Sequence, residues 1–287
     1  MANKHIDEVS GVETTGHSWD GIRELNNPLP AWWVWTFYFT IVWAIGYMVI
    51  YPAIPLVSGN TQGIWGWSSR GAVNADLTAA KAAQAQFVDQ IAAKDVAGIL
   101  ADDNLRQFAI AGGAAAFKVN CVQCHGSGAA GSPGYPNLND NDWLWGGSAD
   151  AIYTTLTHGI RYASDADTRV SEMPAFADIL NADQVGQVAA YAASLAGGQA
   201  DAAKVEAGKT VFAENCASCH GEDAKGGRDF GAPNLTDAIA LYAADEAAIA
   251  AQIAKPKHGV MPAWGARLGD TTVKQLAVYV HSLGGGE

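Results

Sequence analysis

The sequence predicts an all-α protein in which one N-terminal transmembrane helix is followed by two tandem copies of a small helical domain. Three observations lead to this architecture. Residues 31–51 contain no charged side chain. The pattern Cys-x-x-Cys-His occurs twice, and much of the surrounding sequence repeats with it. Around both copies, apolar residues recur every three or four positions, which is the spacing of one face of an α-helix.

The charge-free segment is long enough to cross a bilayer, because 21 residues in a helix span roughly 30 Å. A cleavable signal peptide is the competing interpretation. It is disfavoured because 30 residues precede the segment and their net charge is acidic rather than basic. We therefore expect an uncleaved single-span anchor. Aromatic residues lie near both ends of it, as they do at membrane interfaces: Trp32, Trp33, Trp35, Tyr47 and Tyr51.

Every cysteine of the chain belongs to one of the two Cys-x-x-Cys-His motifs, at 121–125 and 216–220. This pattern is typical of covalent c-type haem, in which two thiols bond to the porphyrin and the adjoining imidazole reaches the iron. A structural zinc site needs four ligands, and these cysteine pairs are far apart. A redox dithiol would not require a histidine after both motifs. We expect two covalently bound haem c groups, attached and ligated by Cys121, Cys124, His125, Cys216, Cys219 and His220.

Methionine provides an independent indication of the sixth iron ligands. Apart from the initiator and one residue of the apolar segment, the chain contains two, Met173 and Met261. Each follows one haem motif and begins a Met-Pro-Ala-aromatic sequence, so we expect each to ligate the haem of the motif before it. Such ligation raises the haem potential and suits electron transfer. A second interpretation makes His258 the sixth ligand of the second haem, and a third places His158 and His258 beside the haem edge or at turns.

The repeat extends well beyond the motifs. Matching positions include Gly113 and Gly208, Phe117 and Phe212, Pro136 and Pro233, and Tyr191 and Tyr279. The first copy carries an insertion at 161–172, rich in Asp, Ser and Arg. We expect each copy to have one helix before its motif and another after its methionine, the latter ending at glycines. A copy of about 90 residues is small for a self-sufficient core, so the haem would supply much of the apolar interior.

This order of helix, haem motif, loop, methionine and helix resembles the class I cytochromes c. In that family a proline helps to orient the proximal histidine through its backbone carbonyl, and Pro136 and Pro233 occupy matching positions. The resemblance implies two tandem class I cytochrome c domains, at 104–200 and 201–287. Before them we expect a cytoplasmic tail at 1–30, the anchor at 31–51, and a periplasmic linker containing a helix at 52–103.

The anchor region adds a more selective resemblance. Asn-Pro-Leu-Pro-x-Trp-Trp at 27–33, together with Gly46-Tyr47, Tyr51-Pro52 and the two haem domains, resembles the dihaem subunit of cbb3-type cytochrome c oxidase, known as subunit III. The likeness covers essentially the whole chain. It implies that Cys121, Cys124, Cys216 and Cys219 hold the haems and that His125, Met173, His220 and Met261 ligate the irons.

The same resemblance implies partners and an activity. The chain would take electrons from a cytochrome c donor and pass them through a membrane-bound monohaem cytochrome c subunit. They would then reach the catalytic b-haem and copper subunit, which reduces oxygen to water. No catalytic centre is expected on this chain itself. Two other functions stay open: a free-standing anchored dihaem shuttle, and a dihaem peroxidase, which would need an open sixth position on one iron.

Location and charge limit the possible partners further. Haem c is attached outside the cytoplasm, so we expect a bacterial inner-membrane protein with its N-terminus in the cytoplasm and its haem domains in the periplasm. The net charge of −12 excludes nucleic acid as a natural partner. It is compatible with electrostatic steering of a basic donor, and equally with a role in solubility alone.

Overall fold

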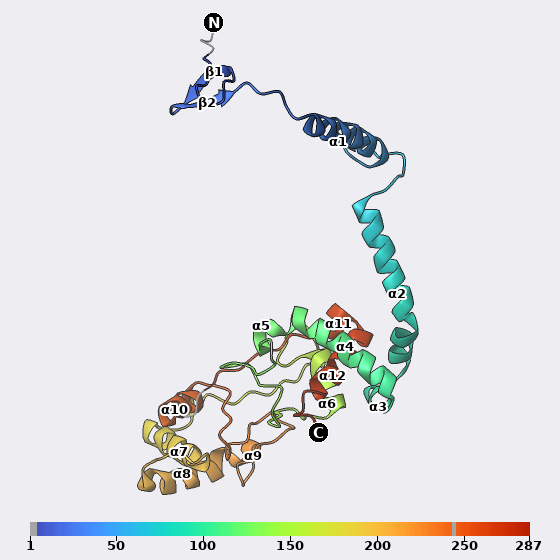
Figure 1. Cartoon of the computed structure of the whole chain (residues 1–287). Coiled ribbons are helices and arrows are strands. Elements are labelled where there is room, and N and C mark those ends of the chain that lie inside the picture. Colours follow the sequence, from blue (N-terminus) through green and yellow to red (C-terminus); the bar gives the residue numbers. More distant parts are fainter. Residues whose placement is uncertain (1–4, 243–244) are drawn as a thin grey trace. The chain divides into compact units, whose positions relative to one another are not determined.

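A computed structural model describes residues 5–242 and 245–287, so the initiator methionine lies outside the described residues. The architecture is helix-rich, as predicted (Figure 1). The helices are α1 (Ala31–Ile50), α2 (Ser69–Ala93), α3 (Val96–Leu100), α4 (Asp103–Asn120), α5 (Val122–His125), α6 (Ala149–His158), the 3-10 turn η1 (Phe176–Asp178), α7 (Ala182–Leu195), α8 (Ala202–Asn215), α9 (Ala217–His220), α10 (Glu246–Ala254), α11 (Gly265–Leu268) and α12 (Asp270–His281). The strands are β1 (Thr14–Trp19), β2 (Ile22–Leu25), β3 (Pro55–Leu56) and β4 (Gly59–Asn60). The chain divides into two units, Met1–Ala83 and Gln84–Glu287.

Helix α1 forms the apolar segment of the first unit. Its mean hydropathy of 1.6 and its 20 residues make it long and apolar enough to cross a membrane. None of its side chains is buried. Prolines set both ends: Pro30 stands just before the first turn, and Pro52 disfavours helical backbone at Tyr51. Tyr51 is accordingly extended, at φ −109° and ψ 160°.

The first unit also contains two short antiparallel hairpins that the sequence analysis did not include. In the N-terminal tail, β1 pairs with β2, and Trp19 lies opposite Ile22. The two residues between them, Asp20 and Gly21, both have positive φ, as a type I′ turn requires. After α1, β3 pairs with β4, and the loop that follows brings Trp65 and Trp67 edge-on against the Tyr51 ring.

In the second unit, the helix that precedes each haem motif packs against the helix that ends the other copy. Helix α4 lies along α12, and α8 lies along α7 (Figure 1). The helix between the haem motif and the methionine of each copy also packs on the last helix of the other copy: α6 packs on α12, and α10 packs on α7. Each packed core therefore combines helices from both predicted segments, 104–200 and 201–287. The core around α4 takes its last helix, α12, from the second segment, and the core around α8 takes α7 from the first.

Small and aromatic residues define both helix crossings. At the α4–α12 crossing, a Cβ on Gly113 would collide with the carbonyl oxygen of Gln275, so only glycine permits this approach. The Phe117 ring lies 5.4 Å from the Tyr279 ring at the same crossing. At the α8–α7 crossing, Gly208 meets Gln187 in the same way, and Phe212 lies 5.3 Å from Tyr191. Matching residues of the repeat thus make equivalent contacts at the two crossings, and each contact joins one copy to the other.

A short connection accounts for this exchange. Only residues 196–201 separate α7 from α8, and a helix–helix connection of that length makes consecutive helices neighbours. Because α8 covers the matching face of α7, helix α4 packs instead on α12, whose sequence matches that of α7. The exchange follows from the position of α7 immediately before the second copy.

Part of the predicted linker belongs to the core around α4. Ile91 near the end of α2 and Ile99 in α3 are fully buried, and Val96 is 2% exposed. The ring of Phe87 stacks on that of Phe108 at 4.9 Å. The last turns of α2 and all of α3 therefore form an additional layer on the first core.

Candidate haem sites

Each haem motif folds into a single helical turn. In the first, Cys121 precedes α5 and is buried, Cys124 is exposed, and His125 is the last residue of the turn. The second motif repeats this arrangement with Cys216, Cys219 and His220 around α9. All four thiols are free of disulfide bonds. Burial, with a smaller contribution from the neighbouring thiol, raises the pKa of Cys121 and of Cys216 to about 11.

A proline carbonyl orients each motif histidine. The Nδ1 of His125 lies 3.0 Å from the carbonyl oxygen of Pro136, and the Nδ1 of His220 lies 3.2 Å from that of Pro233. Because a carbonyl only accepts hydrogen bonds, Nδ1 carries the proton and the Nε2 lone pair remains for a metal. Burial lowers the pKa of both histidines, which favours this neutral form.

The two methionines pack on opposite haem motifs from those we expected. Met261 packs against the core that contains Cys121 and Phe117, the core of the first motif. Met173 packs against the core that contains Cys216, the core of the second motif. This packing differs from the expected order, in which each methionine ligates the haem of the motif before it. The reason is the helix exchange, because each methionine leads into the helix that packs on the other copy.

The segment after α6 holds Met261 in place. The backbone N–H of Ile160 donates to the Met261 carbonyl at 2.9 Å, and the N–H of Met261 donates to the Ile160 carbonyl at 3.0 Å. Gly159 makes this approach possible: its φ is +72°, and a Cβ there would collide with the Met261 carbonyl oxygen. The sequence analysis did not predict this bridge. Its only signal was a glycine after a histidine in both copies, Gly159 and Gly259.

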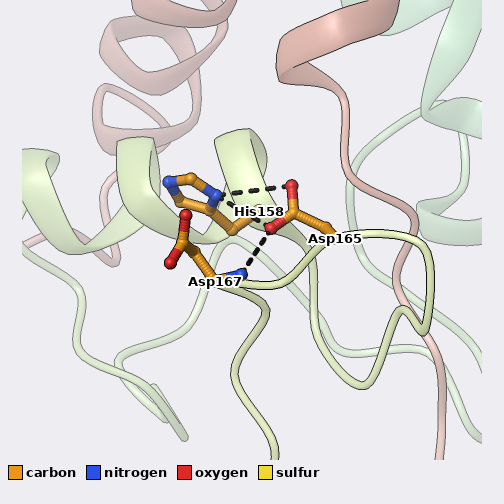
Figure 2. Close-up of side chains that lie close together, drawn as sticks. All are labelled: His158, Asp165 and Asp167. Carbon is orange, nitrogen blue, oxygen red and sulfur yellow. Dashed lines mark hydrogen bonds and ion pairs between the residues drawn. The ribbon is translucent and has the colours of Figure 1, made fainter.

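Two other histidines, His158 and His258, were considered as neighbours or ligands of the haems. His158 ends α6, and its Nδ1 lies 3.1 Å from Oδ1 of Asp165 in the insertion (Figure 2). The backbone N–H of Asp167 donates to the same oxygen at 2.9 Å. The ligand atoms of these three residues lie within 4.8 Å of one another, and these hydrogen bonds account for their closeness. His258 is exposed, whereas Met261 packs against the first core.

Both sites offer the set of ligand atoms that c-type haem requires. Each site offers two thiols and an imidazole from one helical turn. A thioether then packs on the same core from another segment. Apolar side chains surround the buried thiol in both sites, including Phe117 and Leu138 in the first and Phe212 and Leu235 in the second. Such surroundings keep water away from an iron, which helps to set its potential.

Comparison with known families agrees with this geometry. The family described as the N-terminal domain of cytochrome oxidase-cbb3, FixP, matches residues 11–58. The family described as cytochrome c oxidase, cbb3-type, subunit III, matches residues 108–191 and 203–280, which is more than half of the chain. The chain belongs to the subunit III family. The two matched stretches each contain one Cys-x-x-Cys-His motif, which indicates two c-type haem groups.

Members of this family resemble the chain over its full length. The cbb3-type cytochrome c oxidase subunit FixPc of Rhizobium leguminosarum bv. viciae is 63% identical, and the alignment covers 100% of both chains. The subunit CcoP of Cereibacter sphaeroides is 55% identical over 96% of this chain and 95% of that one. The subunit FixP of Azorhizobium caulinodans is 49% identical over 98% of this chain and 96% of its own length.

Proposed function

We propose that this chain is the dihaem electron-transfer subunit of a cbb3-type oxidase. It accepts electrons from a cytochrome c donor and relays them to a membrane-bound monohaem cytochrome c subunit. From there they pass to the catalytic b-haem and copper subunit, where oxygen is reduced to water. The observation that carries the proposal is the paired donor set: each core offers one histidine and one methionine to the same site.

The ligands are assigned by core rather than by sequence order. Cys121 and Cys124 hold the first haem, with His125 and Met261 as its axial ligands. The second haem is held by Cys216 and Cys219, with His220 and Met173 as its axial ligands. Bound haem c supplies a one-electron carrier. A histidine and a methionine offered to each iron would leave no ligand position for oxygen or peroxide, which favours relay over catalysis.

The proposed location follows from the anchor and the cofactor. Helix α1 crosses the bacterial inner membrane once, the tail before it is cytoplasmic, and the residues after it are periplasmic. Support comes from the length and hydropathy of α1 and from the attachment of haem c outside the cytoplasm. The loop after α1 carries exposed Trp65 and Trp67, a residue type common at membrane interfaces.

A mild-detergent pull-down through a tag after Glu287 tests the proposal. We expect b-type haem beside c-type haem in the reduced-minus-oxidised spectrum of the eluate, with oxygen uptake driven by reduced cytochrome c. A Cys216→Ser, Cys219→Ser double variant is the matched control, since it should lose one of the chain's two c haems. Two c haems per chain without b haem or oxygen uptake would contradict the oxidase assignment and favour an anchored shuttle. A high-spin haem that responds to peroxide would favour a peroxidase.

A further inference from the structure

The two methionine segments differ in one respect. In the second copy, His258-Gly259-Val260 leads directly to Met261. In the first, the insertion at 161–172 separates His158-Gly159-Ile160 from Met173. The insertion therefore has no counterpart in the second copy, and any contact it makes is made once in the molecule.

The first residue of the insertion contacts both methionine segments. The Nε of Arg161 donates to the carbonyl oxygen of Gly259 at 2.7 Å, two residues before Met261. Its Nη1 donates to the carbonyl oxygen of Ser171 at 2.8 Å, two residues before Met173. Hydrogen bonds from a charged donor are about twice as strong as neutral ones. One guanidinium thus joins the segments that lead to the two iron ligands.

The backbone that carries Arg161 is itself fixed. Its N–H donates to the carbonyl of Arg169 at 2.8 Å, and its φ of +52° is unusual for a residue with a side chain. The preceding residue, Ile160, is bridged to Met261. The backbone of Arg161 is therefore held beside the Met261 segment, and this fixes the position from which its guanidinium donates two hydrogen bonds.

The rest of the insertion is anchored to the first copy. Asp165 binds His158 at the end of α6 (Figure 2). The Nη1 of Arg169 donates to the Trp145 carbonyl at 2.9 Å and to the Thr155 hydroxyl at 2.8 Å. These contacts hold the rest of the insertion against the first copy, close to Arg161.

We infer that Arg161 is a positioning residue that holds the two methionine segments together, so that the axial bonds of both haems depend on one side chain. The inference rests on the ligand assignment proposed above. Arginine suits this task because its planar fork presents several donors at fixed angles, whereas lysine offers one nitrogen on a flexible stem. Loss of the fork should loosen both methionines from their irons, even though Arg161 belongs to only one copy.

The test compares three variants of the full-length, haem-loaded chain purified in mild detergent: Arg161→Lys, Arg161→Gln and Arg228→Gln. The lysine variant keeps the charge and loses the fork. Arg228 is the matched control for charge, because it is exposed and pairs with Glu287 away from the methionine segments. The readouts are the sulfur-to-iron charge-transfer band of the oxidised protein and the binding of CO to the reduced c haems.

Both Arg161 variants should raise the CO-reactive fraction of reduced c haem about tenfold, which corresponds to about 1.4 kcal/mol. At saturation they should bind more than one CO per chain, because both haems open, and both should weaken the sulfur band. Arg228→Gln should match the unaltered chain. Should Arg161→Gln fail to accumulate with two haems, Arg161→Lys decides the question alone.

Two outcomes overturn the inference. The first is an Arg161→Lys chain that behaves like the unaltered chain, since then only the charge matters. The second is CO binding that saturates at one per chain, since then only one segment depends on the arginine. A failure of methionine ligation itself looks different: the unaltered chain would lack the sulfur band and bind two CO.

Discussion

The first and second haem sites are built from the same pieces, yet they are covered differently. The first carries the additional layer formed by α3 and the end of α2, where Ile91 and Ile99 are fully buried. The second core draws its buried residues from η1 and the helices α7 to α10, such as Val188 and Ala189. The repeat thus determines the ligands of a site, while the residues outside the repeat determine how well it is shielded from water.

The largest effect is expected when the two copies are produced as separate chains. Produced alone, residues 84–200 lack Met261 and α12, and residues 201–287 lack Met173 and α7, so neither should form a methionine-ligated haem. Co-production of the two pieces should restore both sites, as followed by the sulfur-to-iron band. A methionine-ligated haem in 201–287 alone would show that each copy serves itself.

Histidine in place of either methionine tests the crossed ligation directly. In a Cys216→Ser, Cys219→Ser background, which retains only the first haem, Met261→His should lower the potential by roughly 0.1–0.2 V, within the ~0.8 V range that axial ligands set. Met173→His should leave that haem unchanged. A potentiometric titration distinguishes the two, and the opposite pattern would restore ligation in sequence order.

The additional layer can be weakened separately. Ile99→Ala should destabilise the first site by about 2–5 kcal/mol, because it leaves a cavity in a fully buried position. The second haem should lose its methionine at an unchanged denaturant concentration. Ile179→Ala is the control, because that side chain is 59% exposed and its loss should cost less than about 0.5 kcal/mol. Equal effects of Ile99→Ala on both haems would mean that the layer supports the whole unit.

Matching glycines give a finer contrast between the copies. Gly159→Ala should cost about 1–3 kcal/mol, because its φ is +72° and its Cβ would collide with the Met261 carbonyl. Gly259→Ala should be tolerated, since the nearest atom to its Cβ would be the Tyr242 hydroxyl at 3.6 Å. Thermal unfolding of the two variants measures the difference. Equal losses would show that the Ile160–Met261 bridge has no special role.

The last expected effect depends on pH and concerns Asp142. Burial, with the nearby charges of Asp237 and Asp140, raises its pKa to about 6. A raised folded-state pKa means that stability falls as pH rises from about 4 through 6, because the folded protein resists losing this proton. Asp142→Asn should remove that decline, so its melting temperature should exceed that of the unaltered chain above pH 6 and match it near pH 4. A difference that does not vary with pH would assign the effect to packing.

The sequence specified local structure well and long-range pairing poorly. The helical turn of each haem motif, the apolar helix α1, the helices that flank the motifs and the contact from histidine to proline all depend on residues close in sequence, and all are present as predicted. The exchange is different, because the residues at both crossings are the same. Gly113 would fit against Tyr191 as well as it fits against Tyr279, so no residue pattern distinguishes the two pairings. The deciding feature is the short chain between α7 and α8.

Two further features had weak signals in the sequence. The hairpin in the tail was indicated by Asp20-Gly21, a dipeptide that favours a type I′ turn, but acidic composition alone described the tail. The layer on the first core lies in the segment at 52–103 that was predicted to be a periplasmic linker containing a helix. The burial of Ile91, Val96 and Ile99 depends on their packing against the first core, which the sequence of the linker alone does not reveal.

The crossing of the two copies dictates the order in which the protein can be completed. The thiols of the first haem motif are made early, whereas the methionine proposed to face that haem lies 140 residues after Cys121, shortly before α11. Contacts over such separations form slowly, since long loops must close first. If Met261 ligates the first haem as proposed, that haem can gain its second protein ligand only after nearly all of the chain has been synthesised, whereas Met173 is already present when the second motif emerges. The site made first is the one finished last.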